Sequence, residues 1–293
     1  MKTVRTLIAC FALATFTVCA PEPDQPPVKR TLDEKFNATG LRLFREERYR
    51  EALQNFREAM AIKPDEAEYA NNAGICLLRL NRPDLALALF DETLKRKPDH
   101  GLYHYNHGLA LRDLGRTAPA LAAFAKATAL EPDLFDARVQ SGLLLLGTKR
   151  PGAAADAFRA ALEGRDDYEL RGYLGVALLE SGKLGEARVE LERALELNDE
   201  YYLSYFNLGV LHQKADQPAQ AVERFAQARR LNPNYYPTYY NEARSLADLG
   251  RLEQARAALE GYIARLPAGL AAQHADARKF LRELEAASKR IKR

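Results

Sequence analysis

Residues 101–134 read GLYHYNHGLALRDLGRTAPALAAFAKATALEPDL, and their pattern of small, large and proline positions returns every 34 residues along the chain. The copies, called units below, begin at Asp33, Ala67, Gly101, Phe135, Tyr168, Tyr202 and Tyr236, and the fourth is one residue shorter than the others. Position 20 of the unit is always alanine: Ala52, Ala86, Ala120, Ala154, Ala187, Ala221 and Ala255. Position 8 is small: Gly40, Gly74, Gly108, Gly142, Gly175, Gly209 and Ala243. Position 24 is large and apolar: Phe56, Phe90, Phe124, Phe158, Leu191, Phe225 and Leu259.

Each of these positions has a steric purpose in a pair of helices. Small residues at positions 8 and 20 let two helices approach closely, and the large residue at position 24 fills the space beside them. Proline follows the second helix at position 32 in five units, where it ends the helix: Pro64, Pro98, Pro132, Pro233 and Pro267. The spacing predicts seven helix-turn-helix units in series, because a fixed period of this length is typical of a solenoid.

From about Asp33 to Gly269 the chain resembles the tetratricopeptide repeat family, although leucine often stands at position 11, where that family has tyrosine. The resemblance implies an all-α, right-handed superhelical solenoid of about seven helix-turn-helix repeats whose first helices line a concave groove. Residues 270–287 carry Leu270, Ala277, Phe280, Leu281 and Leu284 at helical spacing. We therefore expect seven repeats over residues 33–269, and a capping helix with a basic tail over residues 270–293.

The amino terminus has the features of an export signal. Lys2 and Arg5 precede an uncharged run that ends near Cys19, and a proline-rich stretch follows. We expect a signal peptide over residues 1–18, acylation of Cys19 and an extended tether over residues 19–32. The segment resembles a bacterial lipoprotein signal, although Val18 stands where that family prefers a small residue, and Cys10 lies in a better local motif but after too short an apolar run. A cleaved soluble periplasmic protein and an uncleaved anchor are the alternatives.

The residue that follows Cys19 also bears on where a lipoprotein would be sorted. Ala20 is not the aspartate that retains enteric lipoproteins in the inner membrane. We therefore expect an outer-membrane lipoprotein that faces the periplasm.

The charge balance and the motif content exclude several classes of protein. The chain carries 43 Lys and Arg against 40 Asp and Glu, which is too even a balance for a nucleic-acid partner. Its three cysteines cannot build a disulfide framework or a cysteine-rich zinc site. No nucleophile elbow, metalloprotease motif or phosphate loop is present. We expect no enzyme activity, no cofactor and no metal site.

A histidine cluster supports one competing interpretation. His100, His104 and His107 are spaced four and three residues apart, as a helix requires to bring imidazoles together. Unit positions 4 and 7 normally face the core of a repeat, so we expect structural roles for His104 and His107. A metal-binding protein or an enzyme built on this cluster is the alternative.

Amides and aromatic rings mark the candidate binding surface. Position 6 carries an amide in five units: Asn72, Asn106, Gln140, Asn207 and Asn241. In several tetratricopeptide families an asparagine here faces the groove and binds the backbone of an extended peptide, although simple duplication of one unit would also copy it. Position 5 carries Tyr105, Phe206 and Tyr240, which we expect to point into the same groove, and position 9 carries a charge only at Arg244. The sequence therefore predicts a peptide-binding groove, strongest in the last two repeats.

These features together predict a non-enzymatic scaffold that binds protein or peptide partners in the bacterial cell envelope and is held at the membrane by a lipid anchor. The combination of signal, tether and repeats resembles bacterial pilotin-type lipoproteins, which implies a role in assembling a secretin or type IV pilus complex. An envelope factor associated with glycan or peptidoglycan, bound through the basic tail, is a further alternative.

Overall fold

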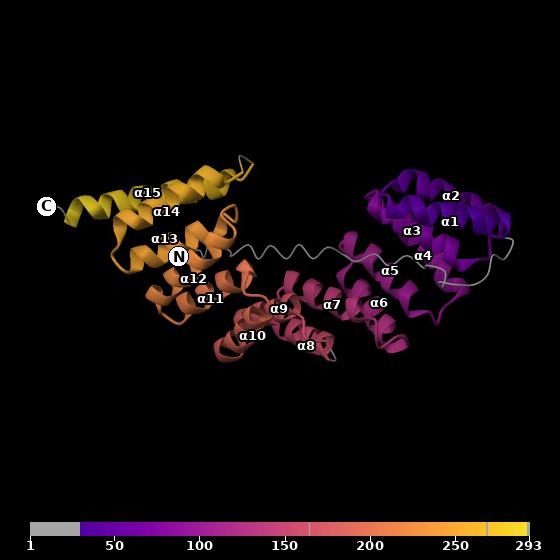
Figure 1. Cartoon of the computed structure of the whole chain (residues 1–293), viewed down its shortest axis with the longest axis horizontal. Helices are drawn as coiled ribbons and strands as arrows, with labels where there is room; N and C mark the ends of the chain where they lie inside the picture. The colour runs from indigo at the N-terminus through magenta and orange to yellow at the C-terminus, as the bar shows by residue number, and fades with distance from the viewer. Residues whose placement is uncertain (1–29, 164, 268, 292–293) are drawn as a thin grey trace. The chain divides into compact units, whose positions relative to one another are not determined.

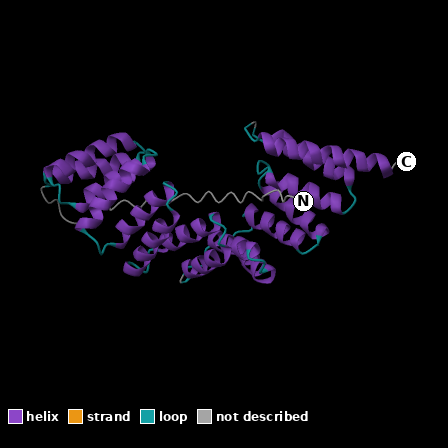
Figure 2. Cartoon of the chain, turned by 180° about the vertical axis from the view of Figure 1, so that it is seen from behind, coloured by secondary structure: helices purple, strands orange, loops and turns teal. Residues whose placement is uncertain are grey.

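The computed structural model describes residues 30–163, 165–267 and 269–291. Within these ranges all regular structure is helical, with 15 α-helices and no strand (Figures 1 and 2). The helices are α1 Leu32–Arg45, α2 Tyr49–Ile62, α3 Ala67–Arg79, α4 Pro83–Arg96, α5 Gly101–Asp113, α6 Thr117–Leu130, α7 Phe135–Gly147, α8 Pro151–Leu162, α9 Tyr168–Glu180, α10 Leu184–Leu197, α11 Tyr202–Lys214, α12 Pro218–Leu231, α13 Pro237–Asp248, α14 Leu252–Arg265 and α15 Ala271–Ile291. The predicted signal peptide, Cys19 and most of the tether lie outside the described residues.

The described residues form two compact units of structure, residues 30–148 with α1 to α7 and residues 149–291 with α8 to α15. In the first, each helix packs against the next in chain order, from α1 to α7. In the second, the same order runs from α8 to α15. The helix starts follow the predicted 34-residue register, so the expectation of an all-α array of tetratricopeptide-like helix pairs is confirmed.

Close contact within a pair depends on glycine at position 8. A Cβ added to Gly74 of α3 would lie 2.5 Å from Cε1 and 2.8 Å from Cζ of Phe90 on α4. Phe90 has no exposed surface, and the same holds for the position-20 alanine of this pair, Ala86. The steric purposes that the sequence predicts for positions 8, 20 and 24 are therefore confirmed here, and Gly40, Gly108 and Gly209 meet their own phenylalanines in the same way.

The turn inside each pair uses one left-handed residue at position 15 of the unit. Glycine occupies it at Gly115, Gly182 and Gly250, and four other residues adopt the same conformation: Glu47, Asn81, Lys149 and Asp216. The left-handed residue lets the next N–H reach back to the first helix, as Arg116 N does to Leu111 O at 2.8 Å. This is the Schellman arrangement, which satisfies carbonyls that the helix end would leave unpaired.

Helix α15 covers the end of the last repeat. Ala277 and Leu284 are buried, and Leu270, Phe280 and Leu281 pack against the same core, which includes α14 residues. The predicted capping helix is confirmed, and it continues to Ile291. Over the described ranges, no helix has both the length and the apolar content that a membrane span requires.

Candidate functional site

Side-chain amides connect the first helices of neighbouring repeats. Asn72 Nδ2 on α3 donates to Asn37 Oδ1 on α1 at 3.2 Å, and Asn106 Nδ2 on α5 donates to Asn71 Oδ1 on α3 at 2.9 Å. In both bonds a position-6 amide donates to the position-5 amide of the preceding unit. We call these four residues the amide ladder. The sequence reasoning did not single out Asn37, although an asparagine at position 5 in each of the first two units was the available signal.

Three of the four ladder residues are fully buried and Asn37 is half-buried, which corrects the expectation that position 6 faces an open groove. Asn72 and Asn106 have no exposed surface, and Gln140 and Asn207 are 4% and 7% exposed. The expectation was wrong because helical spacing gives the direction of a side chain but does not show which neighbouring helix covers it. Gln140 on α7 has a partner of another kind, since Arg112 of α5 donates to its Oε1 at 2.5 Å.

Three polar atoms of the ladder have no hydrogen-bond partner among the residues that the structure describes. They are Nδ2 of Asn71 and the Oδ1 atoms of Asn72 and Asn106, each of which is buried. Each of these amides therefore uses one of its two polar ends within the ladder and leaves the other end unpaired. Buried polar atoms without a partner are uncommon in folded proteins, and each one requires an explanation.

Two of the three predicted aromatic anchors are core residues. Tyr105 and Phe206 are 0% and 1% exposed. The Tyr105 ring lies 5.9 Å from the Phe124 ring, and the Phe206 ring lies 5.7 Å from the Phe225 ring. In both repeats the position-5 ring packs on the position-24 ring of its own unit, so the expectation that these rings project into a groove was wrong.

The predicted residues of repeat seven lie close to the capping helix. Tyr240 is half-buried, with its ring 5.2 Å from that of Tyr262 and 6.0 Å from that of Phe280 on α15. Burial raises the pKa of Tyr240. Asn241 is half-buried and donates to Pro237 O at 2.9 Å, while Arg244 is exposed. The structure therefore places Arg244 on the surface beside two side chains that already have partners within the fold.

The three histidines of the cluster contact separate partners. His100 Nδ1 lies 3.1 Å from a carboxylate oxygen of Glu131, and His104 Nε2 lies 2.7 Å from the carbonyl of Pro98. His107 Nε2 lies 3.0 Å from Oδ1 of Asp91. In the part of the chain that the structure describes, no group of three or more His, Cys, Asp or Glu side chains is placed to hold a metal ion. His104 and His107 are half-buried, and each contacts a group of the fold, which agrees with the structural roles expected for them.

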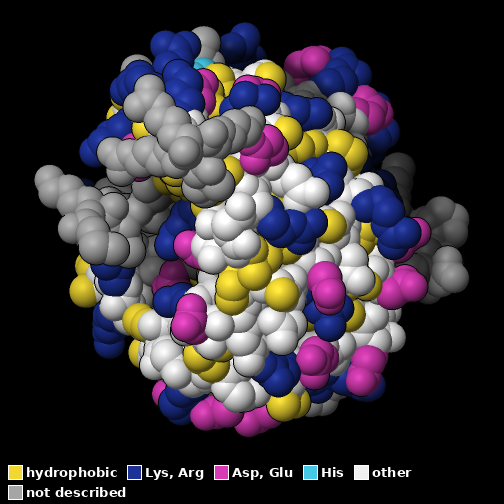
Figure 3. All heavy atoms as spheres, turned by 90° about the vertical axis from the view of Figure 1, so that its left-hand side faces the viewer, with side chains coloured by type: hydrophobic (Ala, Val, Ile, Leu, Met, Phe, Trp, Pro, Cys, Tyr) yellow, Lys and Arg dark blue, Asp and Glu magenta, His cyan; other side chains and the backbone are white. Residues whose placement is uncertain are grey.

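Charge on the face drawn in Figure 3 is mixed. Lys and Arg side chains lie among Asp and Glu side chains over this face, and neither sign forms a continuous patch. This agrees with the near balance of 43 basic and 40 acidic residues in the sequence.

Two family models, both described as tetratricopeptide repeat, match most of the chain. One matches residues 43–106 and 212–278, and the other matches residues 105–169 and 142–202. No curated protein matches the chain significantly.

Several solved structures are similar to the chain. MamA from Desulfovibrio magneticus RS-1 is 25% identical, covers 58% of this chain and 97% of its own, and has a TM-score of 0.54. The pilF protein of Pseudomonas aeruginosa is 19% identical over 72% of this chain and 97% of its own, with a TM-score of 0.62. A tetratricopeptide repeat protein from Parabacteroides merdae is 14% identical over 86% and 98%, with a TM-score of 0.64. At these identities the last two likenesses show the fold alone.

Proposed function

Because this chain belongs to the tetratricopeptide repeat family, we propose that it is a scaffold that binds a polypeptide segment along its first helices and catalyses no reaction. Proteins of this architecture commonly present an extended surface of stacked helices to a protein or peptide partner. The observation that supports a site on the first helices is that three amides of the ladder each leave one polar atom without a hydrogen-bond partner among the described residues.

An extended peptide offers the groups that the ladder lacks. Its backbone carries an N–H donor and a C=O acceptor at each residue, whereas the ladder leaves one donor, Asn71 Nδ2, and two acceptors, the Oδ1 atoms of Asn72 and Asn106. These atoms lie on adjacent first helices, α3 and α5, so one peptide could pair with all of them. Because the atoms are buried, this face must open to admit the peptide.

The test replaces both partners of one ladder bond with apolar residues of similar shape, Asn71→Leu together with Asn106→Leu. Removing both ends of a buried hydrogen bond is often nearly neutral for stability, whereas removing one end leaves an unpaired group. We expect the double variant to melt close to wild type and to lose capture of its partner. The matched control changes two amides of a second helix, Gln54→Leu and Asn55→Leu, and should retain capture. Unchanged capture by the ladder variant would place the binding surface elsewhere.

We also propose that the protein acts in the cell envelope as a lipoprotein anchored through Cys19, in the outer membrane and facing the periplasm. The basic residues Lys2 and Arg5, the uncharged run after them and the proline-rich stretch that follows Cys19 support this location. One acyl chain gives only marginal membrane binding, and two or more give durable anchoring. Assistance in assembling a secretin or type IV pilus complex is the narrower role that this architecture favours.

Metabolic labelling with a fatty-acid analogue tests the anchor. We expect label and membrane fractionation in the wild type and loss of both in Cys19→Ser, with Cys10→Ser as the matched control. Label that persists in Cys19→Ser but disappears in Cys10→Ser would assign the acylated residue to Cys10. Capture of secretin or pilus components from detergent-solubilised envelopes would then test the narrower role.

A further inference from the structure

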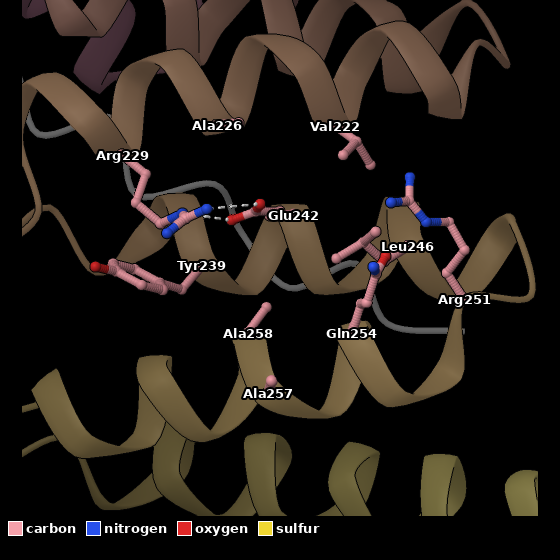
Figure 4. Close-up of a pocket in the computed structure, with 10 residues that line it drawn as sticks. All are labelled: Val222, Ala226, Arg229, Tyr239, Glu242, Leu246, Arg251, Gln254, Ala257 and Ala258. Carbon is pink, nitrogen blue, oxygen red and sulfur yellow. Dashed lines mark hydrogen bonds and ion pairs between the residues drawn. The ribbon is translucent and has the colours of Figure 1, made fainter.

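A pocket of about 460 Å³ lies between the second helices of the last two repeats. Helix α12 supplies one wall, with Val222 and Ala226, and α14 supplies the other, with Ala257 and Ala258. Leu246 of α13 lies between the two walls (Figure 4). The volume falls within the range of about 300 to 1,000 Å³ that small-ligand sites occupy. The pocket is separate from the amide ladder, which belongs to α1, α3 and α5.

Small side chains form much of the lining of the pocket. Ala226 stands at unit position 25, where the third repeat also has alanine, Ala125, and the other five repeats carry a larger, charged side chain: Arg57, Asp91, Arg159, Glu192 and Glu260. Alanine at this place leaves the space between the second helices unfilled. Ala257 and Ala258 on the opposite wall widen that space.

One end of the pocket holds an ion pair that is complete in itself. Arg229 Nε donates to Glu242 Oε2 at 3.0 Å, and Arg229 Nη2 donates to Oε1 at 3.4 Å (Figure 4). The Glu242 side chain is only 8% exposed, and both of its oxygens are engaged. Since Arg229 neutralises this carboxylate, the end offers little to a cationic ligand.

The other end holds a cation that the fold leaves unpaired. Arg251, in the turn before α14, extends its guanidinium toward Val222, with Gln254 beside it (Figure 4). Among the described residues, no carboxylate lies within ion-pairing distance of Arg251. The lining therefore carries a net charge of +1, from Arg229, Glu242 and Arg251. A guanidinium binds a carboxylate through two parallel hydrogen bonds.

We propose that this pocket binds the carboxyl-terminal end of a polypeptide whose last residue is apolar. The terminal carboxylate pairs with Arg251, and the Gln254 amide hydrogen-bonds the last peptide unit. The apolar side chain lies among Ala226, Ala257 and Leu246. A peptide suits this site better than a fatty acid, because an alkyl chain that filled the pocket would lie against the Arg229–Glu242 ion pair and shield it from water.

The test measures fluorescence anisotropy with the purified protein and a labelled short peptide that ends in Ala-Leu with a free carboxylate. The same peptide with a carboxyl-terminal amide is the matched ligand. We expect the amide to bind at least about tenfold more weakly, because it loses a charge-assisted pairing. Arg251→Gln should weaken binding of the free-acid peptide by a similar factor and leave binding of the amide peptide unchanged. Arg230→Gln removes an exposed cation of α12 outside the pocket and should change the binding of neither peptide.

Filling the pocket provides the second variant. Ala226→Leu should abolish binding of both peptides, whereas Ala219→Leu, the same change at an exposed site on α12, should have no effect. Both sites have room at the surface, so we expect thermal melts close to wild type for both variants.

Three results would overturn the proposal. The first is no binding of the acid peptide, and the second is equal loss in Arg251→Gln and Arg230→Gln. The third is displacement of the peptide by octanoate at a similar concentration, which would assign the pocket to an aliphatic acid. The Asn71→Leu with Asn106→Leu variant should leave this binding intact, so the pocket and the ladder can fail independently.

Discussion

Replacing Gly74 with alanine should destabilise the second repeat even though alanine favours a helix. The new Cβ would lie 2.5 Å from Cε1, 2.8 Å from Cζ and 3.0 Å from Cδ1 of Phe90, whose ring is fully buried, so the ring must shift within a packed core. Overpacking of this kind costs about 1 to 3 kcal/mol, and alanine recovers about 0.5 to 1 kcal/mol of backbone entropy. We therefore expect a net loss of about 1 kcal/mol in the free energy of unfolding.

A double-mutant cycle shows whether this contact is the cause. Repeat seven already combines Ala243 with Leu259, and both are fully buried. Gly74→Ala should therefore be tolerated better beside Phe90→Leu, with the double variant about 1 kcal/mol more stable than the sum of the single changes.

The assay is urea unfolding followed by circular dichroism, with native-state hydrogen exchange of α3 and α4, because a repeat array can depart from two-state behaviour. Gly185→Ala on α10 is the control, since a Cβ there meets nothing within 4 Å. This variant should raise the free energy of unfolding by about 0.5 to 1 kcal/mol. Equal stability of Gly74→Ala and Gly185→Ala, or an additive cycle, would refute the assigned packing.

Three further predictions concern other contacts. Ala120→Leu on α6 should lower the free energy of unfolding by about 1 to 3 kcal/mol, because Ala120 has no exposed surface. A thermal melt like that of the wild type would contradict the assigned register. Asn106→Ala should cost about 1 to 3 kcal/mol in urea unfolding, since it leaves Asn71 Oδ1 buried without its donor, and a neutral result would show that water replaces the bond. Burial lowers the pKa of His107 below 6.5, so the folded state binds its proton less readily than the unfolded state. The stability of wild type relative to His107→Gln should therefore fall as the pH decreases below about 6.5, and a constant difference across pH 5 to 8 would contradict this.

The sequence predicts the fold well because the residues that pack within a repeat recur at fixed positions. Ala120 and Phe124 illustrate this, since steric fit between two adjacent helices requires a small and a large residue at a spacing that the chain itself displays. The capping helix was predictable for a similar reason, because its apolar residues follow helical spacing beyond the last unit.

The candidate site was harder to predict because its side chains bind one another. Asn106 was expected to face a ligand, yet its amide finds Asn71 on the preceding repeat, and the pattern within one unit carries no information about that partner. Tyr105 was misplaced for a different reason, since its ring packs on Phe124 of its own unit, and helical spacing alone does not show that the second helix covers this ring. The Ala226 pocket was missed because it depends on the absence of a large side chain, which is visible only when the second helices are placed beside one another.

The left-handed turns have a consequence for how the chain has evolved. Glu47, Asn81, Lys149 and Asp216 hold φ values of 56° to 60°, a conformation that costs a residue with a side chain about 1 kcal/mol relative to glycine. Glycine fills the same place in three other repeats, so this cost could be removed by single changes at the turns. A lineage selected for maximal stability would be expected to have made those changes. Their absence fits drift near a stability threshold, under which the array retains its shape while its turns vary freely.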